Sequence, residues 1–328
     1  MAIPAKRPQR APGLRPGLAL ALLASLALAM AMAACGPVPP RDPFYLAEAK
    51  DSLERGYHWF QVGCHKEAVR FFDESLVSAR LSDNVPYIVM SLNAKGASHL
   101  ARGDMAKAAP VLNEALELTL AEPGQPELPA LLGNLGTLSY QAGRFDDAKG
   151  FWEKAAEEAL PRGASPAPYL ANLARLELAK GTKESFSEAL DLAMASAGNP
   201  NTPESAKSDI LNMAAVRAMG RGDLSAASTY LESATAIDRK LENQSGLAQD
   251  LETRHELQSL QGDHPAAMQS LARAFYLRAS LQDLPALKKD LALLREGNKA
   301  YGHPADLTPF EAIAKKPELF DPLKEYCP

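Results

Sequence analysis

The chain has 328 residues, of which 46% are hydrophobic and 6% aromatic, and its formal net charge at pH 7 is −5. Residues 1–34 hold four of the 35 basic residues and none of the 40 acidic ones, so residues 35–328 carry a net charge of −9. This acidic balance argues against nucleic acid or an anionic membrane surface as the partner. The low aromatic content and the abundance of Ala disfavour a β-rich fold.

Residues 1–34 have the pattern of a signal peptide. A basic segment without acidic residues precedes an Ala/Leu/Met-rich stretch over 18–32, which suits a signal-peptide core and is short for a membrane span. The sequence Met-Ala-Ala-Cys-Gly that ends at Gly36 resembles a bacterial lipobox. The resemblance implies a lipidated Cys35 at the mature N-terminus and, because Gly36 follows it, sorting to the outer membrane, facing the periplasm. The alternative is ordinary cleavage after Ala33, which would release a soluble protein.

The Pro-rich segment that follows the cysteine predicts a short extended tether over 35–43.

Glycine then recurs with a period near 40 residues. The six turn glycines are Gly63, Gly103, Gly143, Gly181, Gly222 and Gly262. Helical apolar spacing precedes and follows each glycine, so each repeat predicts two amphipathic helices joined by a turn. Glycine suits that turn because it adopts a left-handed conformation without a side-chain penalty. The predicted hairpins are 44–80, 86–120, 126–160, 166–198, 202–240 and 244–281 within a solenoid over 44–281.

Fixed residues follow the turn glycines. Ala recurs five residues on, a large apolar residue nine residues on, and a small residue twelve residues on. The third repeat shows this with Gly136 before the turn and Ala148, Trp152 and Ala155 after it. This pattern resembles the tetratricopeptide repeat (TPR) family. The resemblance implies an all-α, right-handed α-solenoid of about six helical hairpins that stack to form a continuous core.

Two repeats depart from the family pattern. Phe186 stands where the fourth repeat should have Ala, which predicts a shifted second helix in that hairpin. His255 replaces the small residue in the first helix of the sixth repeat.

The C-terminal part predicts a capping helix within 282–301, followed by a Pro-rich tail over 302–328 that we expect to pack along the last hairpin. Besides Cys35, the chain has Cys64 in the first turn and Cys327 near its end. These two lie at opposite ends of the predicted solenoid, so free thiols or an intermolecular disulfide are favoured over an internal bond.

No catalytic constellation, metal motif or cofactor motif is recognisable in the sequence. The six histidines form no His-Glu-x-x-His pair, and no phosphate-binding loop or nucleophile elbow occurs. Asp104, Asp223 and Asp263 follow turn glycines, where they are expected to cap the second helices. We therefore expect a protein that is not an enzyme and that needs neither metal nor cofactor.

The TPR resemblance implies that the first helix of each hairpin lines a concave binding surface. Counting back from the turn glycines places a set of residues there: Tyr57, Asn93, Asn134, Tyr140, Asn172, Arg175 and Asn212. The recurring asparagines offer donors and acceptors to an extended peptide backbone. The alternative is that they pack between adjacent hairpins.

These observations predict a lipid-anchored periplasmic scaffold or adaptor that binds a protein or peptide partner in the cell envelope. Secretin or pilus assembly, exopolysaccharide export and outer-membrane biogenesis all employ TPR lipoproteins. The main alternative is a soluble periplasmic chaperone-like adaptor for extended polypeptide. An enzyme or carbohydrate-binding protein on the same solenoid is a third possibility.

Overall fold

The computed structural model describes residues 42–122, 124–300 and 306–320. The predicted signal peptide, Cys35 and most of the tether lie outside the described residues. The chain divides into two compact units, 1–43 and 44–328, and every described helix belongs to the second. No described helix is long and apolar enough to cross a membrane.

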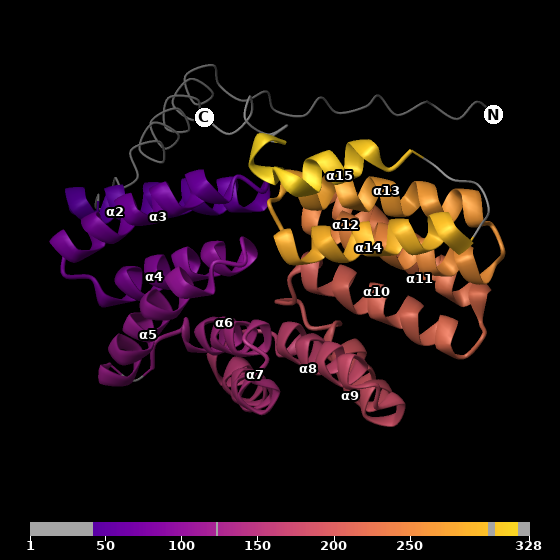
Figure 1. The fold of residues 1–328 in the computed structure, drawn as a ribbon. Coiled ribbons are helices and arrows are strands. Elements are labelled where there is room, and N and C mark those ends of the chain that lie inside the picture. The colour runs from indigo at the N-terminus through magenta and orange to yellow at the C-terminus, as the bar shows by residue number, and fades with distance from the viewer. Residues whose placement is uncertain (1–41, 123, 301–305, 321–328) are drawn as a thin grey trace, which may run out of the picture. The chain divides into compact units, whose positions relative to one another are not determined.

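The described helices pair into six antiparallel hairpins followed by two further helices, and no strand occurs among these residues (Figure 1). The hairpins are α2 (Phe44–Gln61) with α3 (His65–Leu81), α4 (Val85–Ala101) with α5 (Met105–Ala121), α6 (Leu128–Gln141) with α7 (Phe145–Ala159), α8 (Ala167–Lys180) with α9 (Lys183–Ser196), α10 (Glu204–Gly220) with α11 (Leu224–Leu241), and α12 (Gln244–Leu260) with α13 (His264–Ser280). They are followed by α14 (Leu284–Ala300) and α15 (Thr308–Lys315), and the chain is an all-α helical-repeat solenoid.

The turn within each hairpin is built in the same way. All six turn glycines have φ between +69° and +81°, a conformation that a side chain would strain. The carboxylates of Asp104, Asp223 and Asp263 accept hydrogen bonds from the backbone N–H groups of Lys107, Ala226 and Ala266 at 2.9–3.3 Å. The expected helix caps are therefore present.

Each of the first three hairpins closes around a glycine in its first helix. A Cβ atom added to Gly56, Gly96 or Gly136 would overlap Phe72, Leu112 or Trp152 on the second helix. These large side chains are almost fully buried, and the Trp152 indole N–H also donates to the Gly133 carbonyl at 3.0 Å. The small and large residues of the repeat are therefore partners in one contact.

The fourth hairpin keeps the register of the others, so the predicted shift of its second helix is wrong. Helix α9 begins two residues after Gly181, as α7 does after Gly143. Phe186 is buried with Leu190 and Ala193, which lie nine and twelve residues after the glycine, as in the other repeats. The hairpin therefore accepts a bulky residue at the Ala position without moving the helix.

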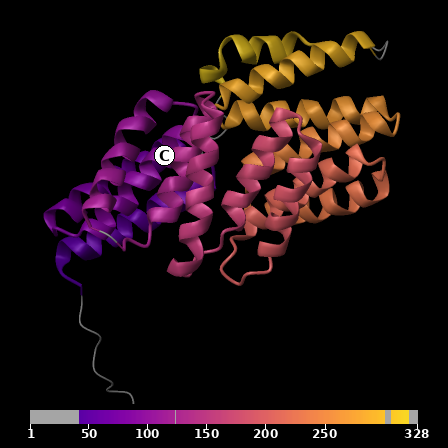
Figure 2. The same cartoon turned by 90° about the horizontal axis from the view of Figure 1, so that it is seen from below.

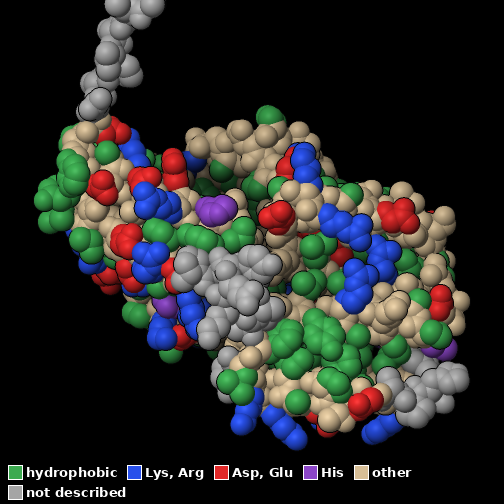
Figure 3. Space-filling model, turned by 90° about the horizontal axis from the view of Figure 1, so that it is seen from above, with side chains coloured by type: hydrophobic (Ala, Val, Ile, Leu, Met, Phe, Trp, Pro, Cys, Tyr) green, Lys and Arg blue, Asp and Glu red, His purple; other side chains and the backbone are tan. Residues whose placement is uncertain are grey.

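The last two helices cover the end of the array. Leu287, Leu291 and Leu294 of α14 pack against Leu271 and Phe275 of α13. On the other side, Phe310 of α15 lies 5.1 Å from Phe275 and 5.3 Å from Tyr276, measured between ring centroids. Hydrophobic side chains are gathered on the face of the molecule that includes α15 (Figure 3). The described part of the tail thus packs on the array.

The hairpins of the second unit follow an arc that brings its ends together. Figures 1 and 2 show α6 to α9 at the middle of the arc, with α2 to α5 on one side and α10 to α14 on the other; these two sides are its two arms. The turn between α2 and α3 meets the start of α12 and the turn between α13 and α14. A Cβ added to Gly63 would lie 2.9 Å from a Leu281 methyl group, and the Gln244 side-chain amide donates to the Val62 carbonyl at 3.5 Å.

Candidate functional site: a cavity between the two arms of the arc

The two arms of the arc enclose a cavity of about 810 Å³. One wall comes from the turns of the first three hairpins, through Phe60, Gln61, Leu100, Met105 and Gln141 among others. The opposite wall comes from the start of α10, the α11–α12 connection and the α13–α14 turn. Its lining residues are Pro203, Glu204, Ser205, Leu241, Asn243, Gln244, Ser245, Leu281, Asp283 and Pro285. The volume lies within the range of small-molecule and peptide-fragment sites in proteins.

The lining combines apolar side chains with neutral amides. Gln61, Gln141, Asn243 and Gln244 each carry an amide that can both donate and accept hydrogen bonds. The Gln141 amide already donates to the Leu100 carbonyl at 3.2 Å, which joins the second and third hairpins. Such a lining suits a ligand that has alternating apolar groups and uncharged polar groups.

The ionisable groups of the lining are largely neutralised. Burial, with the Arg102 charge second, lowers the pKa of His65 to about 4, so its imidazole is neutral at pH 7. The Glu204 carboxylate accepts a hydrogen bond from Lys207 at 2.6 Å. Asp283 caps α14 through the Ala286 N–H and receives the Arg278 guanidinium at 3.3 Å. The site therefore has no strong single-sign field, and no Lys or Arg is among its described lining residues.

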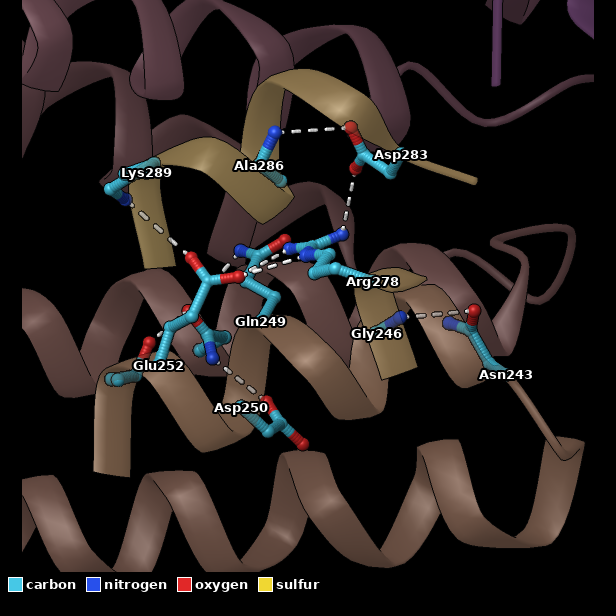
Figure 4. Close-up of polar contacts among 11 residues, drawn as sticks. Asn243, Gly246, Gln249, Asp250, Glu252, Arg278, Asp283, Ala286 and Lys289 are labelled. Carbon is cyan, nitrogen blue, oxygen red and sulfur yellow. Dashed lines mark hydrogen bonds and ion pairs between the residues drawn. The ribbon is translucent and has the colours of Figure 1, made fainter. Parts of the chain in front are cut away.

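A charge cluster holds the α13–α14 turn, which contributes Leu281 and Asp283 to the cavity lining (Figure 4). Arg278 of α13 donates from two nitrogens to one oxygen of Glu252 on α12, at 2.7 and 2.9 Å. Lys289 of α14 lies 3.5 Å from the other Glu252 oxygen. Because Arg278 also holds Asp283, the three helices are joined beside the wall that Leu281 and Asp283 contribute.

The predicted groove residues do not line this cavity, and three of the asparagines bridge neighbouring hairpins. Asn93 is buried and donates to the Glu127 carboxylate at 2.6 Å, while the Asn134 amide N–H donates to the side-chain Oδ1 of Asn93 at 2.7 Å. Asn212 is buried and donates to Asp250 at 2.7 Å (Asp250 is labelled in Figure 4). These amides therefore pack between adjacent hairpins, which was the alternative to contact with a peptide, because their hydrogen-bonding groups are used between neighbouring hairpins.

The remaining predicted groove residues are half-buried and are also engaged within the array. Arg175 donates to Asn172 at 3.1 Å and lies 3.5 Å from Asp209 on the next hairpin. Tyr57 packs edge-on against Phe72, and Tyr140 lies between Phe145 and Trp152. Burial, with the Glu127 charge second, raises the pKa of Tyr57. A contact of these side chains with a partner stays a prediction.

One wall of the cavity could have been predicted from the repeat pattern. Gln61 and Gln141 stand two residues before their turn glycines, so counting two positions back rather than nine or ten would have found that wall. The other wall lies more than 140 residues further along the chain from Gln61. No periodic signal reports that Gln244 and Leu281 meet the first turn, because that contact follows from the accumulated curvature of the array.

Cys64, beside the cavity residues Gly63 and His65, is buried and disulfide-bonded. Its bonding partner lies outside the described residues. The expectation of a free thiol at this position is therefore wrong.

No protein-family model matches the sequence, and no curated protein matches it. Solved structures with a similar fold are found. A Rap conjugation gene regulator of the plasmid pLS20, in complex with the Phr* peptide, superposes with a TM-score of 0.63 at 16% identity, covering 96% of this chain and 86% of that one. A Rap protein complexed with competence and sporulation factor superposes with a TM-score of 0.60 at 14% identity, covering 73% of this chain. This chain spans 66% of that protein's length.

A tetratricopeptide repeat protein from Parabacteroides merdae superposes with a TM-score of 0.42 at 14% identity, covering 83% of this chain and 99% of that one. At such low identities the likeness to the two Rap structures concerns the fold alone. Together with the repeated glycine, alanine and large apolar positions, it shows that this chain has the fold of TPR-type helical-repeat solenoids.

Proposed function

We propose that this protein is an adaptor that binds an extended peptide segment of a partner protein in the cavity between the two arms of the arc. The observation that carries the proposal is the cavity itself, which has apolar side chains and neutral amides on both walls. A peptide in extended conformation exposes one N–H and one C=O per residue, and the amides of Gln61, Gln141 and Gln244 can pair with such groups.

The comparisons support the choice of a peptide over a small metabolite. Both Rap structures that share this fold with a TM-score of 0.60 or more are complexes, one with the Phr* peptide and the other with competence and sporulation factor. The lining also lacks Lys and Arg among its described residues, so an internal peptide segment fits it better than a terminal carboxylate.

We further propose that the protein lies in the bacterial cell envelope, tethered by a lipid on Cys35 and facing the periplasm from the outer membrane. The support is the sequence pattern of residues 1–36 alone. The partner would then be a protein of an envelope assembly such as a secretin or pilus, an exopolysaccharide exporter, or the outer-membrane biogenesis machinery. A mature N-terminus other than acylated Cys35, measured by mass spectrometry, would favour the soluble adaptor instead.

A photo-crosslinking residue placed at Gln141 or Gln244 tests the cavity in the native cell. Both side chains line the cavity, and they come from opposite walls. We expect both positions to crosslink to the same partner peptide, identified by mass spectrometry of the adduct. The same residue placed at the exposed Glu188 of α9, which is not a cavity residue, is the control and should give no such adduct.

A pair of exposed side chains on α5 gives a matched mutational test. Met105 lines the cavity and is 37% exposed, whereas Leu120 is 67% exposed at the other end of the same helix and does not line it. Met105→Asp should abolish the crosslink while the far-ultraviolet circular dichroism stays helical, because it places a charge against an apolar ligand. Leu120→Asp should leave the crosslink intact. Equal crosslinking in both variants would refute the cavity as the binding site.

A further inference from the structure

A second pocket, separate from the cavity, is lined by three arginines from three successive helices. Arg239 of α11, Arg254 of α12 and Arg273 of α13 surround a space of about 370 Å³ together with Glu232, Thr235 and Ala236. None of these residues belongs to the cavity between the arms. The convergence is tertiary, because the three arginines are 15 and 19 positions apart in the sequence.

The three guanidinium groups have no ion-pair partner among the described residues, unlike most other arginines of the array. Among the described residues, the one side-chain hydrogen bond made by these three arginines runs from Arg254 to the Thr235 hydroxyl at 3.3 Å. Asp250 interacts electrostatically with Arg254, but its hydrogen-bonded oxygen accepts from Asn212. Glu232, the one acidic residue of the lining, accepts a hydrogen bond from Ser228 at 3.1 Å. The pocket therefore gathers more positive than negative charge on a chain whose net charge is negative.

We infer that this pocket binds the phosphate group of a phosphate monoester. Guanidinium groups present planar, paired N–H donors that match the oxygens of phosphate. Three arginines and one glutamate give the lining a formal charge of about +2. A phosphate monoester carries a charge of about −1.5 to −2 at pH 7 and therefore balances the lining more fully than a ligand with a single carboxylate. The small volume admits the phosphate with a short attached group, to which Glu232 and Thr235 offer polar contacts.

Two sources can present such a monoester, the phosphorylated side chain of a protein and a free phosphorylated small molecule. Isothermal titration of the full chain with phosphoserine and with glycerol 3-phosphate distinguishes them, with inorganic phosphate as the minimal probe and sulfate as the comparison. We expect saturable binding of the phosphate compounds, and the tighter of the two esters identifies the source. Similar affinity for both esters would mean that the phosphate alone is recognised.

Arg254→Gln should weaken phosphate binding on the order of tenfold or more, because it removes a charge-assisted hydrogen-bond donor from the pocket. Arg239→Gln and Arg273→Gln should weaken it as well, which guards against a folding defect in any one variant. The control is Arg144→Gln, which removes an exposed arginine that pairs with Asp147 on α7, far along the sequence from the pocket. Absence of saturable binding, equal binding of sulfate, or equal loss in the Arg144→Gln control would overturn the inference.

Discussion

At the scale of single residues, the repeat depends on small side chains placed opposite large ones. Gly136 has no Cβ because the Trp152 indole occupies that space, and Gly56 and Gly96 make the same contact with Phe72 and Leu112. A glycine inside a helix costs roughly 0.5–1 kcal/mol relative to alanine. The close approach of the two helices offsets this cost, because it buries the large side chain completely.

Gly136→Ala is therefore expected to destabilise the protein even though alanine is the better helix former. The new methyl group would overlap Trp152, and such overpacking costs about 1–3 kcal/mol. Gly150→Ala on α7 is the matched control, because a Cβ there meets no atom within 4 Å and should stabilise by roughly 0.5–1 kcal/mol. Chemical denaturation of both variants checks the pair. A Gly136→Ala variant as stable as the wild type would show that the indole moves aside at no cost.

Asp290 is a second residue whose setting has a measurable consequence. Its side chain is fully buried on α14, and neither carboxyl oxygen has a hydrogen-bond partner among the described residues. Burial, with the Glu252 charge second, raises its pKa to about 7, although Arg278 and Lys289 oppose the shift. Asp283 adds to the rise. The folded state therefore binds this proton more tightly than the unfolded state does.

The contribution of Asp290 to stability is consequently full below about pH 4 and is lost as the pH rises toward 7. One such group changes the free energy of unfolding by at most ~1.4 kcal/mol per pH unit in that window. Asp290→Asn removes this dependence, so the variant should gain in melting temperature relative to the wild type between pH 5 and pH 8. Thermal unfolding at several pH values measures the difference. Parallel curves for the two proteins would contradict the raised pKa.

At the scale of the helices, each hairpin is closed by apolar contacts, whereas polar groups help to set how hairpins stack. Asn93 and Asn134 join the second and third hairpins, and Asn212 joins the fifth and sixth through Asp250. A buried polar group without a partner costs about 1–3 kcal/mol, so these bonds favour one stacking register over its neighbours. The same logic applies to Arg278, which joins the last hairpin to α14.

Removing Arg278 should therefore cost far more than removing an exposed arginine. The Arg278 and Glu252 side chains are only 10% and 14% exposed, so Arg278→Ala would leave Glu252 buried without its main partner, at a cost of about 3–5 kcal/mol. Arg295→Ala breaks the more exposed pair with Glu311 and should cost less than about 1 kcal/mol. Urea denaturation of the two variants gives both values. If the two variants lose similar amounts of free energy of unfolding, the Arg278–Glu252 pair is hydrated rather than buried.

At the scale of the whole array, a contact between its two arms borders the candidate site. The first turn meets Leu281 and Gln244, and this contact adjoins the cavity because Gly63, Gln244 and Leu281 all belong to its lining. A solenoid stores little energy in any one long-range contact, since most of its contacts are between neighbours. The enclosure therefore rests on a few side chains at the meeting point.

Hydrogen exchange tests this contact within one molecule. The turn at Gly63 touches the opposite arm, whereas a Cβ on Gly143 would meet nothing within 4 Å. Amides at 62–65 should consequently exchange more slowly than those at 142–145. In the double variant Gln244→Ala/Leu281→Ala the difference should shrink, while α6 and α7 stay protected. If the difference in exchange is unchanged in the variant, the contact of Gln244 and Leu281 with the first turn is not what protects the amides at 62–65.

The sequence by itself determined the unit of the fold. Six glycines at positive φ, the aspartate caps and the pairing of small with large residues are local features, and a period near 40 residues repeats them visibly. The fourth hairpin shows the limit of this local logic, because Phe186 breaks the pattern while Leu190 and Ala193 keep the helix in register. Burial of the whole helix face outweighs one departure from the consensus.

Only the tertiary structure decided where the candidate site lies and which hydrogen bonds the recurring asparagines make. The cavity joins Gln61 to Gln244 through the curvature that small rotations between successive hairpins add up to, whereas the arginine pocket joins three helices that are neighbours in the array. Those rotations depend on side-chain packing at each interface, and no periodic pattern records their sum. For the same reason the asparagines expected to face a ligand instead bridge hairpins, because the neighbouring helix lies close enough to take their hydrogen bonds.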